Sequence, residues 1–109
     1  MALAESGSMS RLFRVDYGKG RTFVFLSGEH DLSTTPALRH IMAEAIATND
    51  ADVVVDLSEV KFMGATTVGV IVRARAFLRQ HSRTLTVRAS SPQARHVLEV
   101  CDLLDILEA

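Results

Sequence analysis

The sequence predicts an α/β fold with a single small mixed β-sheet that carries its helices mainly on one face. Two alternating apolar and polar segments, residues 11–17 and 22–28, flank the turn Gly18-Lys19-Gly20 and predict an N-terminal hairpin. Segments with helical periodicity then alternate with apolar segments, which is typical of parallel strands linked by right-handed crossovers. With 109 residues, the chain is long enough for one domain and too short for two.

The first helix is expected soon after the hairpin. Thr35 is predicted to cap it, with Pro36 in the first helical position, where the missing N–H has no helical partner to lose. Asn49-Asp50 is expected to end it. Between these ends the apolar residues recur with helical spacing and form one stripe, made of Leu38, Ile41, Met42, Ala45 and Ile46.

A buried strand and a second helix follow. Residues 53–57, VVVDL, predict a strand that is covered on both faces, and Asp56 is expected to cap the turn after it. The second helix is predicted to start at residues 65–67 and to run to Gln80, with Arg75 and Arg79 facing outward. Its apolar stripe consists of Val70, Ile71, Ala74, Phe77 and Leu78.

The last elements are a strand at residues 84–89 and a third helix that opens at Ser91-Pro92. Three residues of this helix are expected to face the core: Val97, Leu98 and Cys101. We take residues 9–109 as the folded domain. Residues 1–8 are expected to be a disordered leader added ahead of it, because small polar residues there precede a second methionine.

Several features predict a cytoplasmic protein. No apolar run approaches the roughly 20 residues that a membrane span requires. The N-terminus has neither the basic region nor the apolar region of a signal peptide. The single cysteine, Cys101, excludes an internal disulfide and fits a reducing compartment.

The net charge of −1 conceals an uneven distribution. Residues 60–98 contain no Asp or Glu, although they hold seven Lys and Arg side chains. Such a stretch is typical either of a solvated helix face or of a surface for an acidic protein partner. The low aromatic content of 6% and the absence of net positive charge argue against direct binding of nucleic acid.

Two hydroxyl residues, Thr66 and Thr67, stand where the second helix begins, beyond the carboxyl end of a central strand. Ligands and phosphate groups bind at this position in open α/β sheets, because free N–H groups and the helix dipole favour negative charge. The pattern leaves two alternatives open. The threonines are either plain helix caps, or one of them is the site of a phosphorylation switch.

A second polar cluster, Glu29-His30-Asp31, ends the second strand. Neighbours on a strand point to opposite faces, so these three side chains cannot converge on one metal ion. Either the cluster is a solvated strand end, in which Asp31 supports the next turn, or Glu29 and Asp31 lie beside the Thr66 loop on the rim where a partner docks. The sequence contains no Walker A loop, nucleophile elbow, paired-cysteine motif or His-Glu-x-x-His motif. We therefore predict a binding protein without enzymatic activity, metal or cofactor.

Three segments in order resemble the STAS domain, in particular bacterial anti-sigma factor antagonists. LSGEHDLSTTPALRHIM (26–42) is similar to the strand end and first helix of that family. VVVDLSEVKFMGATTVGVIVRAR (53–75) is similar to its central strand and switch loop, and SSPQARHVLEVCDLLDIL (90–107) to its third helix. The resemblance extends from Phe13 to Leu107 and implies a regulatory binding protein.

The resemblance implies that the unphosphorylated protein binds an anti-sigma factor, often itself a serine kinase, and thereby frees a sigma factor. It implies phosphorylation of Thr66, with Thr67 second. The implied partner-binding residues are Glu29, Asp31, Gly64, Ala65, Thr66, Thr67 and Arg73.

One alternative function stays open, and the oligomeric state is a separate question. Gly64 and Ala65 replace an acidic and a hydroxyl residue of the family pattern. They motivate an alternative function, a STAS binding module without phosphorylation that regulates a transporter, sensor or signalling complex. An edge strand in the hairpin also predicts pairing with a second copy, as a homodimer.

Overall fold

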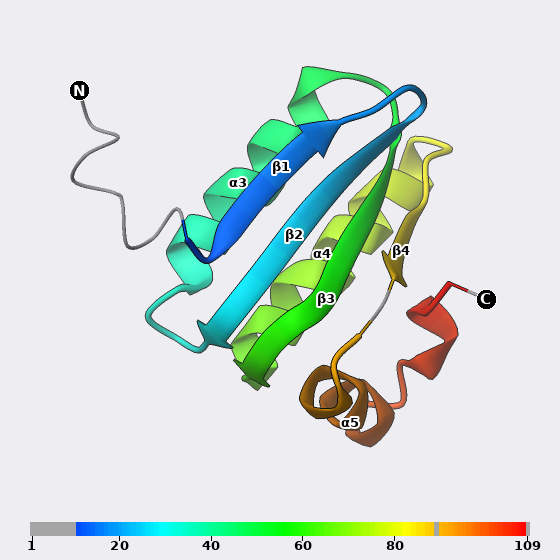
Figure 1. The fold of residues 1–109 in the computed structure, drawn as a ribbon. Helices are drawn as coiled ribbons and strands as arrows, with labels where there is room; N and C mark the ends of the chain where they lie inside the picture. Colours follow the sequence, from blue (N-terminus) through cyan, green and yellow to red (C-terminus); the bar gives the residue numbers. More distant parts are fainter. Residues whose placement is uncertain (1–10, 89, 109) are drawn as a thin grey trace.

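The computed structural model describes residues 11–88 and 90–108, and the predicted leader at residues 1–8 lies outside them. The fold is one four-stranded mixed sheet in the order β1-β2-β3-β4, with α-helices after β2, β3 and β4 (Figure 1). β1 is antiparallel to β2, and the other pairs are parallel, which confirms the predicted fold class. The elements are β1 (Phe13–Tyr17), β2 (Arg21–His30), α3 (Thr35–Thr48), β3 (Asp52–Met63), α4 (Ala65–Gln80), β4 (Leu85–Arg88), α5 (Pro92–Val100) and the 3-10 helix η1 (Leu104–Ile106).

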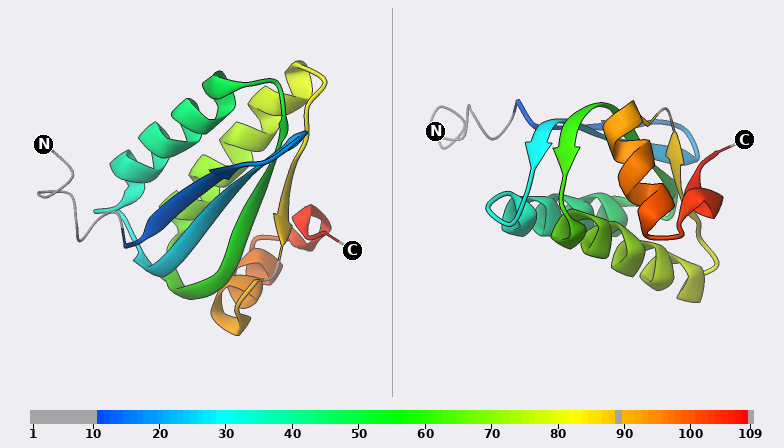
Figure 2. Two further views of the ribbon diagram at one scale, coloured as in Figure 1. Left: turned by 45° about the horizontal axis from the view of Figure 1, so that its top comes forward. Right: turned by 90° about the horizontal axis from the view of Figure 1, so that it is seen from below.

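The hydrophobic core lies between the sheet and the helices α3 and α4, which run side by side along one face (Figure 2). α5 packs near the end of β3, at the other side of the sheet from β1. The apolar stripes predicted for the helices supply much of this core. Their buried members are Leu38, Met42 and Ala45 in α3, Val70, Ile71, Ala74 and Leu78 in α4, and Leu98 in α5.

The opposite face of the sheet carries aromatic side chains that arginines cover. β2 alternates between buried and half-buried residues, so that Phe23 and Phe25 point away from α3 and α4. The guanidinium of Arg14 lies 3.9 Å from the ring centre of Phe25, and that of Arg88 lies 4.7 Å from that of Phe23. These cation–π contacts shield apolar rings on a face that α3 and α4 do not cover.

β3 is longer than the predicted strand at residues 53–57, because it continues to Met63. Two register shifts against β2 give β3 one extra residue each, near Asp56 and near Val60. Such bulges interrupt the side-chain alternation on which the sequence prediction depends. Asp56 caps no turn after the strand. It lies within β3, where its carboxylate accepts hydrogen bonds from the Ser58 N–H (2.9 Å), the Ser58 hydroxyl (2.6 Å) and Arg88 Nε (3.3 Å).

The packing of the helices corrects several sequence expectations. α3 begins at Thr35 itself, with Thr34 as its N-cap and no side-chain capping bond, so Thr35 is not the cap. Phe77 is 47% exposed, because it faces a groove between α3 and α4. Cys101 follows α5 and is exposed as a free thiol. Arg75 does not face freely outward, since its side chain is mostly buried and bonds Asp105 at 3.2 Å.

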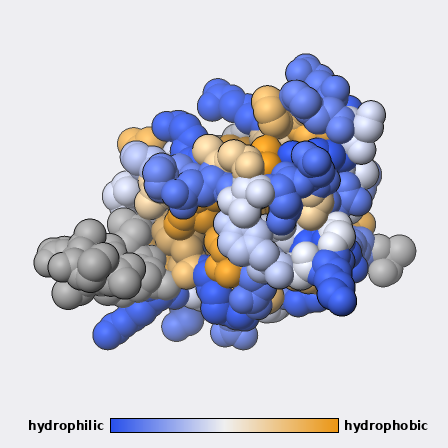
Figure 3. All heavy atoms as spheres, turned by 90° about the horizontal axis from the view of Figure 1, so that it is seen from above, coloured by the Kyte–Doolittle hydropathy of each residue, from blue (hydrophilic) through white to orange (hydrophobic). Residues whose placement is uncertain are grey.

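The surface of the protein is mixed in polarity. Seen from above, the molecule shows apolar side chains exposed among hydrophilic ones (Figure 3). Among the described residues, no helix is long and apolar enough to cross a membrane.

Candidate functional site

The carboxyl ends of β2 and β3 bring two loops and two helix starts together. β2 ends at His30 and β3 ends at Met63, and these two residues are register partners in the parallel pair. The N–H of Gly64 donates to the carbonyl oxygen of His30 at 2.9 Å, which joins the loops directly. The first turns of α3 and α4 therefore lie beside each other at this edge of the sheet.

Gly64 is the N-cap of α4. Its backbone is extended, and its carbonyl oxygen accepts from the N–H groups of Thr67 (3.1 Å) and Val68 (3.3 Å). No side chain caps the helix, so the interpretation of Thr66 or Thr67 as a plain N-cap is wrong. Among the described residues, the N–H groups of Ala65 and Thr66 have no acceptor, as expected at a helix start. Together with the helix dipole, they favour a negative charge at this point.

The two threonines have different environments. Thr66 is exposed, and its hydroxyl oxygen lies 3.0 Å from that of Thr35. The Thr35 hydroxyl also lies 2.9 Å from the carbonyl oxygen of Asp31. Thr35 is the donor in both contacts, so its one hydroxyl proton is shared between the Thr66 hydroxyl oxygen and the Asp31 carbonyl oxygen. Thr67 is fully buried, and its hydroxyl has no hydrogen-bond partner among the described residues.

The polar cluster at the end of β2 divides between solvent and core. Glu29 and Asp31 are exposed, whereas His30 is fully buried. The Asp31 carboxylate accepts from the Ser33 hydroxyl (2.6 Å) and the Ser33 N–H (2.9 Å), so it supports the turn into α3 as predicted. The same two hydrogen bonds lower the pKa of Asp31, which therefore stays a carboxylate.

The buried His30 packs beneath the surface of the site and holds the end of β2 in place. One ring nitrogen lies 2.9 Å from the carbonyl oxygen of Ser27, and the ring packs edge-on against Phe13. Burial is the largest influence on its pKa and lowers it, while the hydrogen bond to Ser27 and the nearby Asp31 act in the opposite direction. His30 thus serves packing rather than surface recognition.

Most of the predicted partner-binding residues gather at this edge of the sheet: Glu29, Asp31, Gly64, Ala65, Thr66 and Thr67. Arg73 lies two turns further along α4, at the groove with α3. Sequence reasoning missed Thr35 as a site residue. The signal was present, because Thr35 precedes Leu38 by three residues and so continues the buried stripe of α3.

The groups at this edge of the sheet are suited to binding another molecule through hydrogen bonds and charge. It offers an exposed hydroxyl, two N–H groups and two carboxylates within one short surface. Among residues 11–88 and 90–108, no cluster of three or more His, Cys, Asp and Glu side chains could hold a metal ion.

Comparisons with known proteins agree with this architecture. A family model described as "Mlab, STAS domain" matches residues 13–108. An anti-sigma-B factor antagonist of Listeria monocytogenes serovar 1/2a is 31% identical over 85 residues, which cover 78% of this chain and 75% of the relative. This chain therefore belongs to the STAS domain family.

Solved structures show the same fold. An anti-sigma factor antagonist from Mycobacterium paratuberculosis is 26% identical with a TM-score of 0.75, over 87% of this chain and 80% of that one. The anti-sigma factor antagonist SpoIIAA in its unphosphorylated form gives a TM-score of 0.78 at 18% identity, over 88% and 85% of the two chains. The phosphorylated form of SpoIIAA from Bacillus gives 0.71 at 18% identity, over 88% of each chain. At 18% identity, both SpoIIAA matches concern the fold alone.

Proposed function

We propose that this chain is a cytoplasmic anti-sigma factor antagonist, which binds an anti-sigma factor with serine kinase activity and thereby frees a sigma factor. The names of its curated relatives support this function, since a relative at 31% identity is an anti-sigma-B factor antagonist. The exposed, unpaired thiol of Cys101 is consistent with a reducing compartment.

The proposed switch is phosphorylation of Thr66. One observation carries it: Thr66 is an exposed residue in the first turn of α4, and it lies beside two N–H groups that have no acceptor among the described residues. A kinase can reach the Thr66 hydroxyl oxygen, and the helix start favours the phosphate that it would receive. Thr67 is the weaker candidate, because its hydroxyl is fully buried under the same turn.

Phosphorylation would change this surface in two ways. A phosphate adds about −1.5 to −2 charges at neutral pH. Glu29 and Asp31 are exposed at the same edge, so the added charge would convert a mildly acidic surface into a strongly acidic one. It would also place the phosphate on the oxygen that accepts from the Thr35 hydroxyl. A partner that fits the unphosphorylated surface would then lose complementarity.

The proposed docking surface consists of the exposed residues around this hydroxyl. Glu29, Asp31, Ala65 and Thr66 are exposed, and Gly64 is half-buried between them. Arg73 extends the surface along α4, whereas Thr67 supports it from within. SpoIIAA has structures in an unphosphorylated and a phosphorylated form, so a protein with this fold can carry a phosphate.

A second candidate function is a STAS binding module that is not phosphorylated and regulates a transporter, sensor or signalling complex. The hydrogen bond between Thr35 and Thr66 favours it, because that bond already occupies the Thr66 hydroxyl. Gly64 and Ala65, which offer a kinase neither an acidic nor a hydroxyl side chain, favour it as well.

Affinity capture from the host lysate, with and without ATP, tests the proposed function. We expect the wild-type chain to recover an anti-sigma factor, and phosphosite mapping after incubation with ATP to find phosphate on Thr66. Thr66→Ala should capture the same partner without modification. A matched control is Thr84→Ala, since Thr84 is also exposed but lies at the opposite end of the parallel strands. Stable partner capture with no phosphate at Thr66 would favour the second candidate.

The homodimer stays a prediction as well. Within the described part of the chain, β1 pairs with β2 alone, and its exposed Arg14 and Asp16 occupy the sheet edge. In an antiparallel pair centred on Val15, Arg14 of one copy would face Asp16 of the other. Sedimentation of wild type against Val15→Pro, which blocks edge pairing, tests this arrangement.

A further inference from the structure

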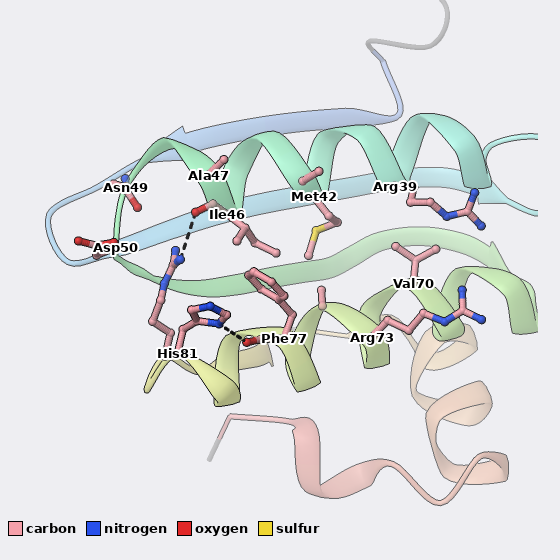
Figure 4. Close-up of a pocket in the computed structure, with 13 residues that line it drawn as sticks. Arg39, Met42, Ile46, Ala47, Asn49, Asp50, Val70, Arg73, Phe77 and His81 are labelled. Atoms are coloured by element: carbon pink, nitrogen blue, oxygen red, sulfur yellow. Dashed lines mark hydrogen bonds between the residues drawn. The ribbon is translucent and has the colours of Figure 1, made fainter.

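A groove of about 600 Å³ lies between α3 and α4 (Figure 4). Apolar side chains from both helices line its centre: Met42 and Ile46 from α3, and Val70, Ala74 and Phe77 from α4. Phe77 is 47% exposed, although it belongs to the apolar stripe of its helix. The groove thus leaves apolar surface uncovered where two neighbouring helices would otherwise close over the core.

The two ends of the groove differ in charge. Arg39 of α3 and Arg73 of α4 extend from the same end, the one nearer the helix starts (Figure 4). Neither guanidinium takes part in an ion pair with any residue that the structure describes. Two cations beside an apolar groove without a counter-charge form half of a recognition site for an anion.

At the other end of the groove, the side chains of Arg83 and His81 already have partners. The Arg83 guanidinium donates to the carbonyl oxygens of Ala51 (2.8 and 3.0 Å) and Ile46 (3.1 Å), so it fastens the end of α3 to the start of β3. His81 stacks on Phe77 with ring centres 4.4 Å apart. The groove is therefore polarised, with available positive charge at one end only.

We propose that this groove binds a single-chain amphiphile with an anionic head group, the head on Arg39 and Arg73 and the alkyl chain along the apolar centre. Its volume falls within the roughly 300–1,000 Å³ of small-molecule sites, and its lining of apolar side chains with a few polar groups is typical of them. This site shares Arg73 with the proposed docking surface but lies away from Thr66, and it does not depend on the proposed function.

The lining of the groove suits an alkyl chain with an anionic head. The eleven residues from Arg39 to Asn49 extend over about 15 Å along α3 and its C-cap. An alkyl chain is apolar throughout, so it matches the apolar centre of the groove and would cover the exposed ring of Phe77. Its anionic head would then lie beside the two guanidinium groups of Arg39 and Arg73.

Calorimetric titration with sodium dodecanoate, below its micellar concentration, tests the proposal. We expect saturable binding of one dodecanoate per chain. Dodecylammonium, which has the same chain and the opposite charge, should bind at least tenfold more weakly. Arg39→Glu with Arg73→Glu should weaken dodecanoate binding at least tenfold. Arg79→Glu is the matched control, because Arg79 is exposed on α4 and does not line the groove, and it should change binding less than twofold.

A second variant tests where in the groove the alkyl chain binds. Ala47 is exposed and lines the groove, so Ala47→Trp should fill it and abolish binding while circular dichroism shows an intact fold. Amide chemical shifts of the wild type give a readout that needs no variant, and dodecanoate should move those of Ile46, Val70 and Phe77. No saturable binding, equal binding of both probes, or shifts outside the groove would overturn the proposal. So would a dimer or a protein complex that Ala47→Trp dissociates while dodecanoate fails to bind.

Discussion

The hydroxyl oxygens of Thr35 and Thr66 lie 3.0 Å apart and join the first turns of α3 and α4. This contact links two helices that follow neighbouring parallel strands. It therefore connects Thr66, through hydrogen bonds, with the loop that carries Asp31. The link passes through Thr35, which is buried and also bonds the Asp31 carbonyl oxygen. The exposed hydroxyl is thus attached to the scaffold rather than isolated on the surface.

Thr35→Val tests the contribution of this link to stability. The substitution keeps the shape of the side chain and removes its hydroxyl, so the Thr66 hydroxyl oxygen loses its donor. The Asp31 carbonyl oxygen keeps its bonds from the N–H and hydroxyl of Thr34. We therefore expect a loss of about 1 kcal/mol in the free energy of unfolding, measured by urea denaturation. Thr84→Val, at an exposed position, is the control and should change stability by less than half as much.

Thr67→Val is expected to act in the opposite direction. The Thr67 hydroxyl is fully buried and has no partner among the described residues, so it is desolvated without a compensating hydrogen bond. Replacing the hydroxyl by a methyl group of similar size should raise the free energy of unfolding by about 1 kcal/mol. Urea denaturation measures the change, and a loss of stability would mean that the hydroxyl has a partner such as a buried water.

Stability should also depend on the protonation of His30. Burial lowers the pKa of His30 in the folded protein, so the unfolded chain binds a proton more readily. The contribution of neutral His30 is therefore complete above the unfolded pKa of 6.5 and is lost as the pH falls through the lowered folded pKa. We expect the free energy of unfolding to decline more steeply below pH 6.5 in wild type than in His30→Gln. Parallel curves for the two proteins would contradict this assignment.

The sequence was sufficient for the order of the elements and for much of the core, because helical periodicity and the hairpin turn are local signals. The burial of Thr67 could also have been predicted from the sequence. It precedes Val70 by three residues and Ile71 by four, so extending the apolar stripe of α4 backward predicts that Thr67 is buried and Thr66 is not. The structure has this arrangement.

Other features depend on contacts between distant segments and left no local signal. The bulges that carry β3 to Met63 arise from its pairing with β2, and Asp56 is held there by Arg88 from β4. Phe77 follows the spacing of the core, yet it is exposed because α3 does not cover it. The bond from Thr35 to Thr66 joins residues 31 positions apart, which only the parallel topology brings together.

Binding of the captured anti-sigma factor to wild type and to Thr66→Glu tests the central claim most directly. Calorimetric titration at fixed ionic strength gives the dissociation constant for each, with Thr84→Glu as the control for added charge elsewhere. We expect Thr66→Glu to weaken binding at least tenfold, which corresponds to about 1.4 kcal/mol, and the control to stay within twofold. Equal affinity of wild type and Thr66→Glu would contradict a switch at Thr66.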